Sequence, residues 1–129
     1  MIEGKRILLG VTGGIAAYKT AFLASRLTQA GARVDVIMTA GAERFVTPLT
    51  FQGVTGRPVH DDVFGSLPDG RIAHVNLAKD ADLFIVAPLT AHTLARLAHG
   101  LADDLLTVTA LACTAPLLLP TMVTPGVCA

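Results

Sequence analysis

The sequence predicts a single α/β domain with a parallel sheet, and three features of the 129-residue chain support this class. Short apolar runs rich in branched residues alternate with segments of helical periodicity. Each helical segment is long enough to connect two parallel strands by a right-handed crossover. A chain of this length can bury roughly two-thirds of its unfolded surface in one core. The predicted fold is therefore a three-layer, doubly wound sheet of the Rossmann-like or flavodoxin-like kind, with helices on both faces.

The first three elements are a strand, a helix and a second strand. The strands are predicted at residues 6–11, RILLGV, and 33–38, RVDVIM, and Thr39 stands where the second one ends. The helix is predicted over residues 16–30, and Gly31 ends it as a C′ glycine. The apolar side chains that this helix is expected to bury are Ala17, Phe22, Leu23 and Leu27.

A short helix and a turn-rich interval follow. Thr47 and Pro48 have the residue types of an N-cap and a first helical position, and Gly53 or Gly56 is expected to end that helix. Residues 65–71, GSLPDGR, have the composition of a mobile surface loop. These residues separate the first half of the predicted sheet from the second.

The second half of the sheet begins with the apolar run at residues 82–87, DLFIVA, which predicts a central parallel strand. Pro88 bounds this run, and Thr90 is expected to N-cap the helix that follows. One aspartate of residues 103–104 is expected to cap a further helix, and residues 116–120, PLLLP, to form a last buried strand.

Composition excludes several classes of partner and site. The net charge is zero, so the chain has no basic footprint for nucleic acid or an anionic membrane. Cys113 and Cys128 predict no disulfide, and the spacing of the cysteines and four histidines matches no zinc site. Residues 1–6 do not begin a signal peptide, which favours a cytoplasmic location.

The high apolar content has two possible explanations. Residues 105–129 carry no charge and are long enough for a membrane span, but three prolines and several threonines favour a buried helix and strand. Because 52% of the chain is hydrophobic, a homo-oligomer is expected rather than a monomer.

Three turns are expected to meet at the carboxyl ends of the strands, where ligands bind in such sheets. They lie at residues 10–15, 38–40 and 88–93. In the first, GVTGGI, bare backbone amides and the Thr12 hydroxyl could hold a phosphate at the start of a helix. The motif is neither GxGxxG nor a P-loop, because Lys19 lies well inside the helix, so a mononucleotide is expected. Ordinary strand-to-helix geometry is the alternative.

His74 is the strongest acid–base candidate. It precedes the strand that leads to the third turn, and an imidazole can change its charge near neutral pH. His60, His92 and His99 are weaker candidates, and a lone histidine can also be structural. The adjacent carboxylates at residues 103–104 are better explained by helix capping than by hydrolysis.

Five segments, in order along the chain, resemble a known family. They are residues 10–19 (GVTGGIAAYK), 45–49 (FVTPL), 74–77 (HVNL), 87–93 (APLTAHT) and 98–105 (AHGLADDL). Together they resemble the homo-oligomeric flavin-containing cysteine decarboxylases, most closely the branch that acts on phosphopantothenoylcysteine in coenzyme A biosynthesis. The resemblance covers most of the chain and implies one flavoprotein (FMN-binding) domain over residues 1–129.

The resemblance implies an FMN-dependent carboxy-lyase that converts 4′-phosphopantothenoylcysteine to 4′-phosphopantetheine. The flavin would oxidise the cysteine thiol to a thioaldehyde, after which carbon dioxide leaves. FMN would lie between subunits of a trimer or dodecamer, and His74 would act as the catalytic residue from a neighbouring subunit. The implied cofactor-binding residues are Gly10, Thr12, Gly13, Gly14, Ile15, Thr39, Pro88, Thr90, Ala91 and Thr93.

The chain departs from the family pattern near its end. Residues 120–126 read PTMVTPG where the family has Pro-x-Met-Asn-x-x-Met, so Val123 replaces an asparagine. Residue 129 precedes the family's C-terminal flap and its proton-donating cysteine, and neither Cys113 nor Cys128 lies in a matching motif. Two alternatives follow: an FMN-binding or regulatory interaction module without full catalysis, and an oxidative decarboxylase of peptidyl cysteine.

Overall fold

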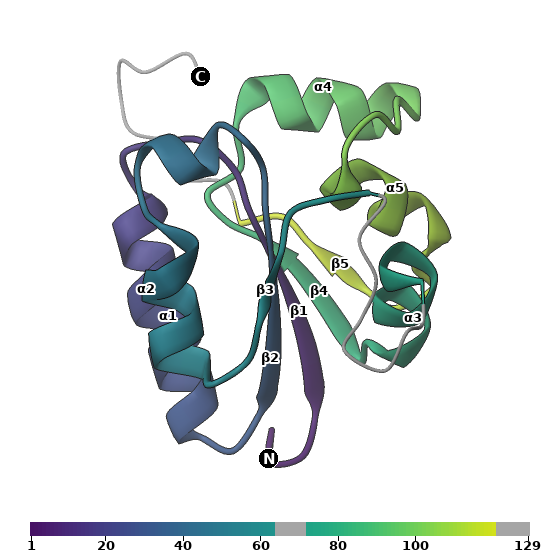
Figure 1. The fold of residues 1–129 in the computed structure, drawn as a ribbon. Helices are drawn as coiled ribbons and strands as arrows, with labels where there is room; N and C mark the ends of the chain where they lie inside the picture. Colours follow the sequence, from purple (N-terminus) through teal and green to yellow (C-terminus); the bar gives the residue numbers. More distant parts are fainter. Residues whose placement is uncertain (64–71, 121–129) are drawn as a thin grey trace.

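The structure is a computed structural model that describes residues 1–63 and 72–120. Its five strands form one sheet in the order β3-β2-β1-β4-β5 (Figure 1). Their bounds are β1 Arg6–Val11, β2 Arg33–Met38, β3 Val59–His60, β4 Leu83–Val86 and β5 Leu117–Leu118. The expectations for residues 65–71, Val123 and Cys128 lie outside the described residues.

Every strand pair is parallel, with β1 at the centre of the sheet. β1 pairs with β2 up to Val11↔Met38 and with β4 up to Gly10↔Val86. The carboxyl ends of these three strands therefore lie side by side. The turns that follow them meet at one edge of the sheet, as the sequence predicts.

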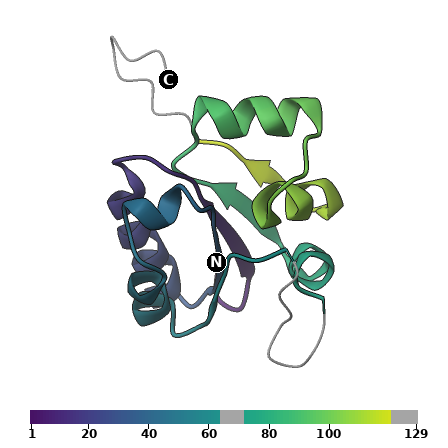
Figure 2. The ribbon, with the colours of Figure 1, turned by 45° about the horizontal axis from the view of Figure 1, so that its top comes forward.

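Helices cover both faces of the sheet (Figures 1 and 2). α1 Ala17–Gln29, η1 Ala42–Arg44 and α2 Pro48–Thr55 pack on one face, while α3 Ala73–Asp80 and α5 Leu105–Ala112 pack on the other. α4 Ala91–His99 begins at the carboxyl edge and packs on α5. This arrangement confirms the three-layer, doubly wound fold.

Several predicted boundaries are confirmed because they depend on local chemistry. β1 and β2 have the predicted bounds, and α2 begins after Thr47 and ends at Gly56, whose φ is +70°. Thr90 caps α4 by accepting the Thr93 N–H at 3.1 Å. Asp104 caps α5 in a capping box with Thr107.

Two burial predictions were wrong. Phe22 is 65% exposed, because α1 turns Ala17, Thr20 and Ala24 toward the sheet instead. The Arg26 guanidinium lies 5.6 Å from the Phe22 ring centroid on the outer surface. β5 is also exposed, since it has only two residues and forms the edge of the sheet. No helix in the described ranges is both long enough and apolar enough to cross a membrane.

The Thr109 hydroxyl is fully buried in α5 and has no hydrogen-bond partner among the described residues. Thr109→Val removes this unsatisfied group at nearly constant volume, so we expect the free energy of unfolding to rise by about 1 kcal/mol. Denaturant unfolding would measure the change. Thr107→Val is the matched control, because it deletes a hydroxyl that bonds to Asp104 at 2.7 Å and should destabilise the protein. Destabilisation by both variants would contradict the prediction.

Candidate functional site

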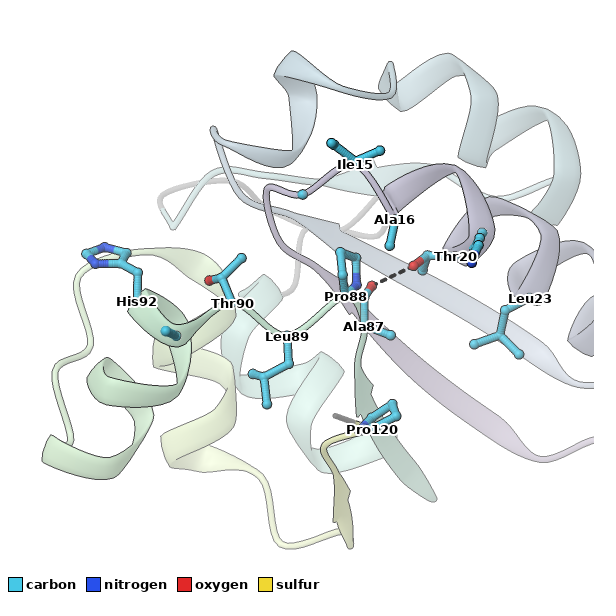
Figure 3. A pocket seen from close by; sticks show the side chains of 13 residues that line it. Ile15, Ala16, Thr20, Leu23, Ala87, Pro88, Leu89, Thr90, His92 and Pro120 are labelled. Atoms are coloured by element: carbon cyan, nitrogen blue, oxygen red, sulfur yellow. Dashed lines mark hydrogen bonds between the residues drawn. The ribbon is translucent and has the colours of Figure 1, made fainter. Parts of the chain in front are cut away.

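A cavity of about 780 Å³ opens beside the carboxyl edge of β4, between the first half of α1 and the β4–α4 turn (Figure 3). Its walls are mostly apolar, and Pro120 closes one side. The 13 lining residues are Gly14, Ile15, Ala16, Lys19, Thr20, Leu23, Ala87, Pro88, Leu89, Thr90, Ala91, His92 and Pro120. Cavities of this size and character hold small molecules and cofactors.

Two helices begin at this cavity. Before α1, the backbone N–H groups of residues 13–16 donate to no acceptor in the described part of the chain, and the first bonded amide is that of Ala17, to Gly14 O at 3.0 Å. At α4, Thr90 caps Thr93, and the N–H groups of residues 91 and 92 likewise find no acceptor within residues 1–63 and 72–120. Free N–H groups at a helix start attract anions. The cavity is therefore suited to a ligand with a negative group.

The first turn packs closely on the turn after β2. A Cβ atom added to Gly13 would lie 2.9 Å from the carbonyl carbon of Gly41. Thr39 stabilises that second turn, since its hydroxyl accepts the Ala42 N–H at 3.2 Å, and it does not line the cavity. Gly10 has a packing role, because a Cβ there would lie 2.8 Å from the Leu106 side chain.

Two threonine hydroxyls hold the β4–α4 turn, in which the Ala87–Pro88 peptide bond is cis. Thr20, on α1, donates to Ala87 O at 2.9 Å, as Figure 3 shows. Thr12, which is 1% exposed, donates to Pro88 O. The Thr12 hydroxyl is thus bonded within the protein. Together these bonds fix one wall of the cavity.

The structure brings five of the nine predicted residues of the first and third turns to the cavity wall. The other four, Gly10, Thr12, Gly13 and Thr93, do not line it. Ile15, Pro88, Thr90 and Ala91 line the cavity with Gly14. Thr93 is 3% exposed and lies beneath the α4 cap, where its hydroxyl bonds to that of Thr90 at 3.0 Å.

His74 lies in the first turn of α3, whereas the sequence placed it just before a strand. It does not line the cavity of its own chain. Its Nδ1 atom is buried and has no hydrogen-bond partner among the described residues. A buried ring nitrogen without a partner is uncommon in folded proteins.

Several charged groups outside the cavity have structural partners. Arg96, on α4, contacts Asp103 and bonds to Asp104 at 3.1 Å, which confirms that the two carboxylates serve the helix junction. A hydrogen bond with Asp61, followed by burial and repulsion from the same carboxyl, raises the pKa of Glu43. Burial lowers the pKa of His60. Within the described ranges, no group of three or more His, Cys, Asp or Glu residues could hold a metal ion.

Sequence reasoning missed the contribution of α1 to the site. Lys19 and Leu23 line the cavity together with Ile15, at intervals of four residues, and Thr20 lines it with Ala16 at the same interval. Residues four apart lie on one face of a helix. This spacing was visible in the sequence, but it did not show which face of α1 borders the cavity.

The family model described as Flavoprotein matches residues 1–125. The chain belongs to the Flavoprotein family. Among curated relatives, the Coenzyme A biosynthesis bifunctional protein CoaBC of Vibrio vulnificus is 51% identical over 115 residues, which are 89% of this chain and 29% of that protein. A probable phosphopantothenoylcysteine decarboxylase of Streptococcus mutans is 48% identical over 122 residues, 95% of this chain and 67% of that protein.

A solved structure supports the same relationship. The FMN-dependent cysteine decarboxylase SpaF has a TM-score of 0.86 and 32% sequence identity, over 97% of this chain and 72% of that one. This Flavoprotein family chain spans 29% of the length of the bifunctional CoaBC relative. The family relationship predicted from the sequence is confirmed.

Proposed function

We propose that this chain binds FMN and decarboxylates 4′-phosphopantothenoylcysteine to 4′-phosphopantetheine, as the flavoprotein domain over residues 1–129. The observation that carries the proposal is the largely apolar cavity at which two helices begin. The relatives named for coenzyme A biosynthesis and for phosphopantothenoylcysteine decarboxylation support this substrate. The FMN-dependent cysteine decarboxylase SpaF supports the cofactor.

The residues present fit FMN. The free N–H groups of residues 13–16 would bind its phosphate, and the apolar wall at Pro88 and Leu89 would lie against its ring system. When bound, FMN would accept two electrons from the substrate thiol, and this oxidation would allow the carboxylate to leave as carbon dioxide. FMN would then return the two electrons to the decarboxylated product. Thr12 and Thr20 would keep the Pro88 wall in position.

The predicted cofactor residues divide into two proposed roles. Direct contacts are proposed for Gly14, Ile15, Pro88, Thr90 and Ala91, which line the cavity, and for Gly13, whose N–H group is free and precedes the lining residues in the same turn. Support of the turns is proposed for Gly10, Thr12, Thr39 and Thr93, whose atoms pack or bond within the protein.

We propose His74 as the acid–base group, supplied by a neighbouring subunit of a homo-oligomer, a trimer or an assembly of trimers. Its absence from the cavity wall of its own chain supports an intermolecular site. The exposed apolar side chains of Ile15, Tyr18 and Phe22 on and before α1 offer a surface for such contacts. The site would operate in the cytoplasm, where cysteine thiols stay reduced.

Anaerobic visible spectroscopy tests the proposed function. Purified protein is loaded with FMN, and 4′-phosphopantothenoylcysteine is added without oxygen. We expect the bound flavin to bleach as the substrate thiol is oxidised. Bound flavin that does not respond would favour an FMN-binding or regulatory module.

A peptide with a C-terminal cysteine is the second substrate to test, because SpaF, a solved structure similar to this chain, is named as a cysteine decarboxylase. Bleaching by the peptide but not by 4′-phosphopantothenoylcysteine would favour the peptidyl-cysteine function. Failure of the protein to bind FMN at all would overturn both enzymatic functions.

A further inference from the structure

Among the described residues, the cavity wall carries two ionisable side chains, those of Lys19 and His92, and no carboxylate. Lys19 lies one helical turn after Ile15 and lines the cavity beside Thr20. His92 lies in the first turn of α4, at the opposite end of the cavity from Leu23 in Figure 3. Within residues 1–63 and 72–120, Lys19 is therefore the one lysine or arginine in the wall at the α1 end of the cavity.

Lys19 has no anionic partner in the described part of the chain. Its ammonium lies 6.0 Å from the ring centroid of Tyr18, and no described carboxylate forms an ion pair with it. The two hydroxyls of the wall already form bonds within the protein, Thr20 to Ala87 O and Thr90 to Thr93. Side-chain recognition of an anion at the α1 end therefore depends on Lys19.

We propose that Lys19 binds the phosphate monoester of a ligand held in this cavity. A lysine ammonium is a compact positive charge with three donors, and lysine is a common ligand of phosphate groups in proteins. The inference rests on the proposed function, which supplies two phosphate monoesters: that of FMN and that of the 4′-phosphopantothenoyl group. Lys19 selects the phosphorylated form of one of them.

Two matched ligand pairs distinguish these sources. Dissociation constants of FMN and riboflavin are measured by quenching of flavin fluorescence in the wild type and in Lys19→Met. Those of 4′-phosphopantetheine and pantetheine are measured by calorimetry on protein saturated with FMN. Lys5→Met removes the same charge at an exposed position before β1 and serves as the control. Lys19→Arg keeps the charge and should retain most of the phosphate preference.

Lys19→Met removes a charge-assisted hydrogen bond, so the binding of the phosphorylated ligand of one pair should weaken by roughly tenfold to a hundredfold. The unphosphorylated member should change less than about twofold, since it never made the contact. A selective loss for FMN assigns Lys19 to the flavin, and a selective loss for 4′-phosphopantetheine assigns it to the substrate.

Equal changes within both pairs, or no change in either, would overturn the role of Lys19 while the proposed function stands, provided that the wild type binds FMN. A wild type that binds neither flavin would overturn both.

Discussion

Replacing His74 by alanine is expected to lower the rate of carbon dioxide release by roughly a hundredfold to ten-thousandfold, the usual contribution of a general acid–base group. FMN should remain bound, because His74 does not line the cavity of its own chain. Carbon dioxide release and flavin absorbance would be measured on the same samples. His99→Ala, an exposed histidine at the end of α4, is the matched control and should keep both properties.

Subunit mixing tests whether His74 acts across an interface. Ala91→Trp is expected to block the cavity, since Ala91 is exposed and lines it, while His74 stays intact in the same chain. Each variant alone should be inactive, but co-expressed chains should regain activity if one provides the cavity and the other His74. Undiminished turnover of His74→Ala would contradict the catalytic role. Failure of the mixture to recover would contradict the intermolecular arrangement.

Local chemistry explains which parts of the fold could be predicted. β1 and β2 are apolar runs bracketed by polar residues and glycine, so their bounds follow from the sequence alone. The same holds for Thr90 and Asp104, because an N-cap side chain bonds within three residues of its own position. The start of α2 after Thr47 is also local, since Pro48 takes the first helical position.

Long-range contacts explain what could not be predicted. Phe22 is apolar and in a helix, yet α1 turns Thr20 inward instead, where its hydroxyl bonds to Ala87 O, 67 residues away. Thr12 makes a similar long-range contact, because its hydroxyl donates to Pro88 O, 76 residues away. Neither partner can be identified from the residues near the threonine.

The candidate site shows the same division. The glycine turn and the Thr90 turn were predicted because each combines a strand end with a helix start. Lys19 was set aside because it is too far along the helix for a P-loop, although α1 brings it to the cavity wall. The prediction for His74 was based on the chemistry of its imidazole, and α3 holds this residue outside the cavity of its own chain.

Replacing Gly13 by valine is expected to weaken FMN binding by roughly tenfold to a thousandfold, equivalent to losing one or two charge-assisted hydrogen bonds to the phosphate. Even a Cβ atom at Gly13 would lie 2.9 Å from the Gly41 carbonyl carbon. The Cβ is fixed to the Gly13 backbone and its neighbour is itself backbone, so no side-chain rotation can relieve the contact. The turn must therefore shift and take its free N–H groups with it. Overpacking of this kind also destabilises a protein by about 1–3 kcal/mol.

Gly53→Val is the matched control, because a Cβ atom at this exposed position of α2 would meet nothing within 4 Å and Gly53 does not line the cavity. Flavin fluorescence titration and denaturant unfolding of the two variants separate loss of the phosphate cradle from loss of the fold. Gly13→Val should weaken FMN much more than riboflavin, since riboflavin lacks the phosphate that the cradle would hold. An equal loss for both flavins would mean that Gly13 shapes the cavity as a whole, and unchanged FMN binding would show that the phosphate lies elsewhere.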